Sequence, residues 1–239
     1  MEKFSGIVFD KDGTLFDFAA TWASWAKSFV EDLANGDTGL AEKLSSAIGF
    51  DLKARDFSAD SPVIAGTPED IAEHLLPHLP GANPSSLINH MNLAAASAPQ
   101  AEAVPLQPLL TELKAMGLKL GVATNDAELP ARSHLNSAGV LEYFDFVSGS
   151  DSGFGGKPHP GSCFAFASQI RTPPGRCIMV GDSRHDLIAG RAAGMTTIAV
   201  LTGLADREVL EPLADAVLMD VGDLPAWIRR QSADQTTAA

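Results

Sequence analysis

Cationic side chains are scarce in this chain. Its 239 residues contain 17 lysines and arginines against 30 aspartates and glutamates, which gives a formal net charge of −13 at pH 7. Nucleic acids and anionic membranes are themselves negatively charged, so a chain with this balance binds them poorly. We therefore expect neither nucleic acid nor membrane among its partners. An anionic ligand would need a site where positive charge is concentrated locally.

Cysteine and long apolar segments are also scarce. Cys163 and Cys177 lack the paired spacing of a metal site, so we expect reduced and mostly buried thiols. The first residues carry no basic stretch followed by an apolar one, and no later run is long enough to span a bilayer. Apolar residues still make up 45% of the chain, enough for a sizeable core. We expect a globular, cytoplasmic protein.

Short apolar segments that end in polar clusters recur along the chain and predict buried parallel strands. These segments are residues 4–9, 118–123, 177–180 and 196–201. Helical periodicity fills the intervals, over residues 106–116, 129–138, 161–170 and 187–193. The alternation predicts an α/β fold with a doubly wound, Rossmann-like parallel-sheet core. In such sheets ligands collect beyond the carboxyl ends of the strands, where the polar clusters fall.

Residues 17–104 show a different pattern. Apolar residues recur there at helical spacing, and no convincing buried strand is present. Four helices are predicted, over residues 22–30, 40–48, 68–76 and 85–96, with prolines in the connections. We therefore expect a small inserted helical domain at 17–104 and an α/β core made of residues 1–16 and 105–239. The small, polar residues 231–239 predict a frayed tail.

Two carboxylates follow the first predicted strand. Because successive strand residues point to opposite faces, Asp10 and Asp12 should share a side while Lys11 points to the other. Converging carboxylates are costly unless a cation neutralises them or they take different protonation states, which suits a metal-bound nucleophile and a general acid/base. Alternatively, Asp12 and Gly13 make a turn that Asp10 caps.

Four segments, in order, resemble the signature motifs of the haloacid dehalogenase superfamily. They are Asp10-Lys11-Asp12-Gly13-Thr14-Leu15, the strand ending at Thr124, Lys157-Pro158, and Gly181-Asp182-Ser183-Arg184-His185-Asp186. The inserted helical region resembles the family's small cap domain, and the phosphoglycolate-phosphatase-like branch is the nearest match. The resemblance implies a magnesium-dependent phosphatase that hydrolyses a small-molecule phosphate monoester, phosphoglycolate or similar, through an aspartyl-phosphate intermediate.

The resemblance also implies catalytic and metal-binding roles. Asp10 would attack phosphorus, while Asp12 would protonate the leaving oxygen and then deprotonate the hydrolytic water. Mg²⁺ would be held by Asp10, the backbone carbonyl of Asp12 and Asp182. Asp186 would support the ligands from behind. Taken alone, Asp186 would instead be a first-turn residue favoured by a helix dipole.

The phosphate itself would be bound by Thr124, Asn125 and Lys157. Thr124 offers a hydroxyl beside backbone N–H groups, and Lys157 supplies the positive charge that the acidic composition otherwise lacks. Taken alone, Thr124 would be a helix N-cap and Lys157 a solvated surface charge.

The chain departs from the family pattern at two places. Lys11 stands where the family usually has an apolar residue, and Phe16-Asp17-Phe18 replaces the usual acidic-and-serine continuation. The second departure weakens an assignment to phosphoglycolate specifically.

Two groups in the inserted region are candidates for substrate contact. Trp22, Trp25 and Phe29 share a helix face, which predicts first a core face, with substrate contact by Trp22 as the alternative. Lys53 and Arg55 are candidates for binding a second anionic group of the substrate, against a solvated connection.

Three other functions remain as alternatives. A sugar phosphomutase, similar to β-phosphoglucomutase, can use the same acids. A phosphonatase needs a cap lysine that forms an imine, and Lys27, Lys43 and Lys53 are available. A non-catalytic phosphate-binding protein could keep the fold alone. The sequence indicates no particular oligomeric state.

Overall fold

One sheet of six strands organises the chain. In the computed structural model, which describes residues 3–237, the strand order is β5-β4-β1-β6-β7-β8 and every neighbouring pair is parallel. The strands are β1 (Gly6–Phe9), β4 (Lys119–Ala123), β5 (Phe146–Ser148), β6 (Cys177–Gly181), β7 (Thr196–Val200) and β8 (Ala216–Leu218). The predicted doubly wound α/β fold is confirmed.

The sheet changes direction of winding at β1. The chain builds β4 and β5 on one side of β1 and then β6 to β8 on the other, so a crevice opens at the carboxyl end of β1. Phe9 is in register with Val122 of β4 and Val180 of β6, and the Asp10 N–H donates to the Val180 carbonyl at 2.8 Å. The residues that follow these three strands therefore meet at one edge.

Helices cover both faces of the sheet. They are α6 (Leu106–Ala115), α7 (Glu128–Ser137), α8 (Gly161–Gln169), α9 (Arg184–Ala193), α10 (Arg207–Leu210) and α11 (Leu224–Thr237). One apolar cluster joins the sheet to α6, α7 and α11, and a second joins it to α8 and α9. Cys163 and Cys177 are free and buried in the second cluster, which confirms the prediction of buried thiols.

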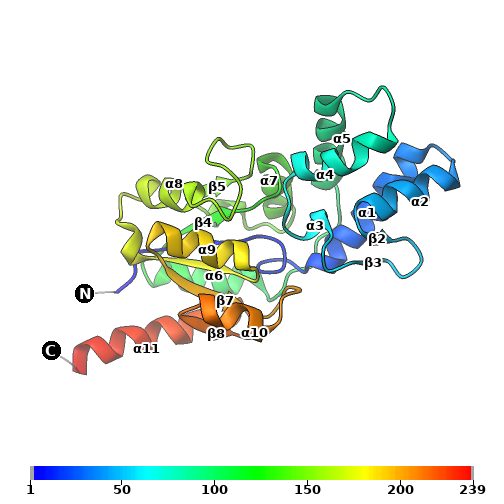
Figure 1. Cartoon of the computed structure of the whole chain (residues 1–239). Helices are drawn as coiled ribbons and strands as arrows, with labels where there is room; N and C mark the ends of the chain where they lie inside the picture. Colours follow the sequence, from blue (N-terminus) through cyan, green and yellow to red (C-terminus); the bar gives the residue numbers. More distant parts are fainter. Residues whose placement is uncertain (1–2, 238–239) are drawn as a thin grey trace.

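Helices also dominate the inserted region. They are α1 (Phe18–Ala34), α2 (Thr38–Ala47), α3 (Pro62–Ala65), α4 (Pro68–Leu75) and α5 (Pro84–Ala96), and they lie beyond one end of the sheet (Figure 1). Their apolar side chains form a cluster of their own that draws only on residues between Phe18 and Ala98. Because this segment has its own core, we propose that residues 17–104 form a cap domain over a core domain of residues 1–16 and 105–239.

Several elements differ from the sequence prediction. Within the inserted region, where no strand was expected, β2 (Phe50–Asp51) and β3 (Asp56–Phe57) form a short antiparallel hairpin. Single 3₁₀ turns lie at Leu76–His78, Leu141–Tyr143, Pro174–Arg176, Glu211–Leu213 and Val221–Asp223.

The predicted frayed tail is wrong as far as residue 237, because α11 continues that far, and residues 238–239 lie outside the described residues. Trp227 and Ile228 anchor α11 on the core, and no glycine or proline follows them to break it. Nowhere between residues 3 and 237 does a helix have the length and apolar character needed to cross a membrane.

Candidate active site

A cavity lies between the strand ends and the inserted helices. Its volume is about 840 Å³, the open mouth included. The core lines it with polar side chains, among them Asp10, Asp12, Thr124, Lys157 and Asp182, while the inserted helices line it mainly with apolar ones. The structure thus brings the residues predicted from separate motifs to one place.

Lys157 lies between two carboxylates at the floor of the cavity. Its Nζ is 2.6 Å from Asp10 Oδ1 and 2.6 Å from Asp186 Oδ1, and all three side chains are buried. Burial alone would lower the pKa of Lys157, but the two carboxylates outweigh it and raise that pKa. The ammonium is therefore charged in this pocket, and the reading of Lys157 as a surface charge does not hold.

Asp10 has an unusual protonation equilibrium. Burial raises the pKa of Asp10 to about 7; the Lys157 ammonium opposes the shift and the Asp186 carboxylate adds to it. Burial likewise raises the pKa of Asp182 well above its ordinary value, and its neighbours Asp10 and Asp186 add to that increase. Burial is the largest cause of both shifts, and the neighbouring carboxylates add to it, so ionising these acids is costly in this pocket.

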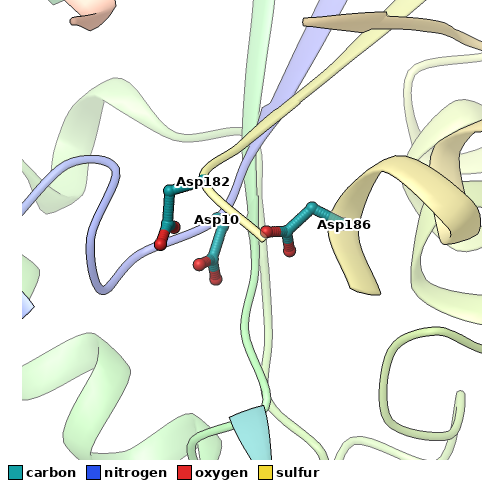
Figure 2. A group of neighbouring side chains, drawn as sticks. All are labelled: Asp10, Asp182 and Asp186. Carbon is teal, nitrogen blue, oxygen red and sulfur yellow. The ribbon is translucent and has the colours of Figure 1, made fainter. Parts of the chain in front are cut away.

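These carboxylates form a group that fits a divalent cation. One oxygen each from Asp10, Asp182 and Asp186 lie within 4.8 Å of one another (Figure 2). Three carboxylates surround one ammonium here, and carboxylate oxygens are ligands that Mg²⁺ prefers. The donor set and its excess negative charge therefore suit Mg²⁺.

The Asp182 carboxylate is held in a fixed position. The Thr14 hydroxyl donates a hydrogen bond to its Oδ1 at 3.0 Å. Gly13, at φ +79°, and Gly203 flank the carboxylate so closely that a Cβ at either would collide with Oδ2. Because only glycine leaves this space, the chain fixes the Asp182 oxygens before any ligand binds.

Asp186 is engaged on both oxygens. Its Oδ1 contacts Lys157, and its Oδ2 accepts hydrogen bonds from the Ser183 N–H at 3.0 Å and the Ser183 hydroxyl at 2.7 Å. The Ser183 contacts form a capping box at the start of α9. Asp186 is thus a first-turn residue of α9, as in the alternative reading, and it also contacts Lys157.

Lys11 does not point away from the carboxylates, and that prediction is wrong. Its Nζ lies 2.7 Å from Asp12 Oδ2 and 3.2 Å from Asp126 Oδ2, and its side chain is fully buried. The reason is that β1 ends at Phe9. In the following turn the Leu15 and Phe16 N–H groups both donate to the Lys11 carbonyl, so strand alternation no longer governs the side chains.

Asp126 and His134 complete a buried network around Lys11. Burial would lower the pKa of Lys11, but Asp12 and Asp126 outweigh it and raise that pKa. Burial raises the pKa of Asp126 to about 6, against the opposing effect of Lys11. His134 Nδ1 lies 2.9 Å from Lys11 Nζ, and burial together with that ammonium lowers the pKa of His134 to about 4.

Sequence reasoning missed Asp126 and His134 as partners of Lys11. Asp126 had a signal, because it belongs to the polar cluster that follows the strand ending at Ala123. His134 had none, since it reaches Lys11 from the middle of α7.

Thr124 and Asn125 follow β4 directly. The N-cap of α7 is Ala127, so Thr124 is not the cap of the alternative reading. Its Oγ1 accepts a hydrogen bond from the Asp126 N–H at 3.1 Å, which leaves the hydroxyl proton for a ligand. The Asn125 amide donates to the Ala65 and Lys157 carbonyls, and its Oδ1 accepts from the Lys157 N–H. The Asn125 side chain is therefore engaged through both its amide nitrogen and its oxygen.

Known proteins resemble the chain over nearly its full length. Residues 4–194 match the family model of the haloacid dehalogenase-like hydrolases. The chain is 28% identical over 236 residues to a phosphoglycolate phosphatase of Neisseria meningitidis, covering 94% of this chain and 92% of that relative.

Two solved structures share the fold. A predicted phosphoglycolate phosphatase from Haemophilus somnus matches with a TM-score of 0.70 at 20% identity, covering 94% of this chain and 97% of that one. A β-phosphoglucomutase from Clostridium difficile matches with a TM-score of 0.66 at 18% identity, covering 99% of this chain and 100% of that one.

Proposed function

Because the chain belongs to the haloacid dehalogenase-like hydrolases, in their phosphoglycolate-phosphatase-like branch, we propose that this phosphatase is magnesium-dependent and hydrolyses a small phosphate monoester through an aspartyl-phosphate. The observation that carries the proposal is the buried group at the cavity floor, where Asp10 lies against Lys157 and beside Asp182. The group combines a nucleophile, a cation for the phosphate and ligands for a divalent ion.

Phosphate binding would use the groups that line this floor. The Lys157 ammonium, which donates a hydrogen bond to Asp10, would also donate one to a phosphate oxygen. The Thr124 hydroxyl and the Asn125 N–H would donate to the other phosphate oxygens. Asp10, the backbone carbonyl of Asp12 and Asp182 would hold Mg²⁺, which supplies positive charge that lets Asp10 approach the phosphate dianion.

The reaction would proceed in two displacements at phosphorus. First, an Asp10 oxygen forms a bond to phosphorus, the ester P–O bond breaks, and Asp12 gives its proton to the leaving oxygen, releasing the alcohol. Second, Asp12 takes a proton from water as the water oxygen attacks phosphorus. The bond between Asp10 and phosphorus breaks, which releases inorganic phosphate and restores both carboxyl groups.

Phosphate release tests this proposal. The purified chain should release phosphate from acetyl phosphate and from alkyl phosphates with Mg²⁺, and EDTA or Asp10→Asn should abolish the release. Asp37→Asn is the matched control, because Asp37 is the exposed N-cap of α2 and asparagine caps equally well; it should leave the activity unchanged. Turnover that survives both EDTA and Asp10→Asn would contradict the proposal.

The same assay separates the alternative functions. Interconversion of glucose 1-phosphate and glucose 6-phosphate without free phosphate would indicate a phosphomutase instead. Binding of phosphate esters without turnover, unaffected by Asp12→Ala, would indicate a binding protein. A phosphonatase lacks its imine-forming group here, because Lys27, Lys43 and Lys53 are not among the residues that line the cavity.

A further inference from the structure

The wall that the inserted helices give to the cavity is apolar and aromatic. It is formed chiefly by Phe18, Trp22 and Trp25 of α1, Ile64 of α3, Ile71 of α4 and Met91 of α5. The Trp22 and Trp25 rings meet edge to face, with centroids 5.2 Å apart and an interplanar angle of 78°. Trp22 packs in the core of the inserted helices and also lines the cavity. It is therefore placed where it could contact a substrate, as well as forming part of the predicted core face.

No cation of the inserted region reaches this wall. Residues 17–104, all of which the structure describes, contain four lysines and arginines, and none of them lines the cavity. Lys53 and Arg55 are exposed beside the β2–β3 hairpin, and Lys27 pairs with Glu31 at 2.6 Å on the outside of α1. Lys53 and Arg55 therefore lie outside the cavity in which they were candidates to bind a second anion.

The two core lysines nearest the cavity are already engaged, and His185 is the other residue of the cavity lining, among those described, that can carry positive charge. Lys157 contacts Asp10 and Asp186 at the phosphate end, and Lys11 contacts Asp12 and Asp126. A second anionic group of the substrate placed against the apolar wall would consequently be buried without a lysine or arginine as partner, which is unfavourable.

The position of Asp12 decides which part of the substrate meets the wall. The Lys11 ammonium contacts the Asp12 carboxylate and lies 5.6 Å from the centroid of the Trp22 ring, so the aromatic wall begins beside this acid. A group that protonates the leaving oxygen lies next to the alcohol part of the ester. The alcohol part would therefore extend from Asp12 along the wall.

We propose that the substrate is a phosphate monoester whose alcohol part is apolar and uncharged, and that phosphoglycolate is a poor substrate. This inference rests on the proposed function, because it assumes that the phosphate is bound at Asp10 and Lys157. Burial of an apolar alcohol against the wall favours binding, whereas the carboxylate of phosphoglycolate finds no cation there.

Three alkyl esters test the substrate class. They are 2-phenylethyl phosphate, glycerol 3-phosphate and phosphoglycolate, and acetyl phosphate serves as a substrate too small to need the wall. The kcat/KM for 2-phenylethyl phosphate should exceed that for either of the other two esters by at least about tenfold. Equal or higher kcat/KM for phosphoglycolate or glycerol 3-phosphate would overturn the inference alone. Absence of phosphate release from all four compounds would overturn the phosphatase proposal, and this inference with it.

A matched pair of variants tests the wall directly. Ile64 and Ile88 are both half-buried in the inserted region, but only Ile64 lines the cavity. Ile64→Asp should lower the ratio of kcat/KM for 2-phenylethyl phosphate to that for acetyl phosphate at least about tenfold, and Ile88→Asp should leave this ratio as in the parent chain. An equal ratio in all three proteins would overturn the role of the wall. If Ile64→Asp does not fold, the ester comparison in the parent chain decides.

Discussion

Lys11 is the residue whose removal should most selectively affect Asp12, the proposed general acid. Its buried ammonium contacts the carboxylates of Asp12 and Asp126, so without it Asp12 loses the contact that orients it. We expect Lys11→Met to lower kcat for an alkyl phosphate about 100-fold, in the range that general acid catalysis contributes. Acetyl phosphate, whose leaving group needs little protonation, should lose much less. Equal losses for both substrates would show that Lys11 acts only through the fold.

His134 should make stability depend on pH. Lys11 can only donate, so Nδ1 of His134 accepts and the ring proton lies on Nε2, which donates to the Ala95 carbonyl at 2.7 Å. The pKa of His134 is lowered from 6.5 to about 4 in the folded chain. As the pH falls, the imidazole is therefore protonated in the unfolded chain at a higher pH than in the folded chain. The stability that His134 contributes above pH 6.5 is therefore lost as the pH falls toward 4, at about 1.4 kcal/mol per unit.

Urea denaturation between pH 4 and pH 7 measures this contribution. The free energy of unfolding of the parent chain should fall relative to that of His134→Gln as the pH is lowered. Both proteins contain the same carboxyl groups, so the difference between them reports on His134. A constant difference between the two proteins across this range would contradict the role of His134.

At the scale of elements, Asn125 connects three segments. Its amide donates to the Ala65 carbonyl at the end of α3 and to the Lys157 carbonyl, while its Oδ1 accepts from the Lys157 N–H. Asn125→Asp should remove both donated hydrogen bonds, each worth about 1 kcal/mol. We expect faster amide hydrogen exchange around residues 62–66 and a lower kcat. Asn136→Asp, at an exposed position on α7, is the control and should change neither; equal exchange in both variants would contradict the link.

The strands could be predicted where burial leaves a clear pattern. β1, β4, β6 and β7 each read as an apolar run that stops at a polar cluster, because both faces of a central parallel strand are covered. β5 and β8 have three residues each and lie at the edges of the sheet, so they leave too short a pattern to recognise.

The sequence predicted which residues belong to the site better than it predicted which side chains contact one another. Motif order indicated Asp10, Thr124, Lys157 and Asp182, and the sheet register brings them to one cavity. The orientation of Lys11 depends on where β1 ends and on partners from distant elements, which local periodicity does not contain. The helical spacing of the α1 tryptophans likewise indicated a buried face, but not that this face also borders a cavity.

At the scale of the whole molecule, we expect the acidic cluster to couple stability to Mg²⁺ and pH. Without metal, the pKa of Asp10 is raised from 3.8 to about 7, so the folded chain holds a proton that the unfolded chain releases. The contribution of Asp10 to stability is present below pH 4 and lost as the pH rises through 7. Under the proposal, Mg²⁺ would compete with this proton and bind the folded chain, so the rise in Tm that it causes should grow from pH 5 to pH 8.

Thermal unfolding with and without Mg²⁺ measures this coupling. Asp10→Asn has one carboxylate fewer, so its Tm should respond less to Mg²⁺ at pH 8. A Tm of the parent chain that is independent of Mg²⁺ at pH 8 would contradict the proposed metal site at Asp10 and Asp182.

The transient phosphorylation of Asp10 is the central claim, and trapping the phosphoenzyme tests it most directly. Asp12→Asn should slow the second displacement, because the group that takes the proton from water is missing. Acid quenching of this variant during turnover of acetyl phosphate, followed by peptide mapping, should place a hydroxylamine-sensitive phosphate on Asp10. The double variant Asp10→Asn, Asp12→Asn should carry none. Turnover without phosphate on Asp10, or phosphate on another residue, would contradict the account.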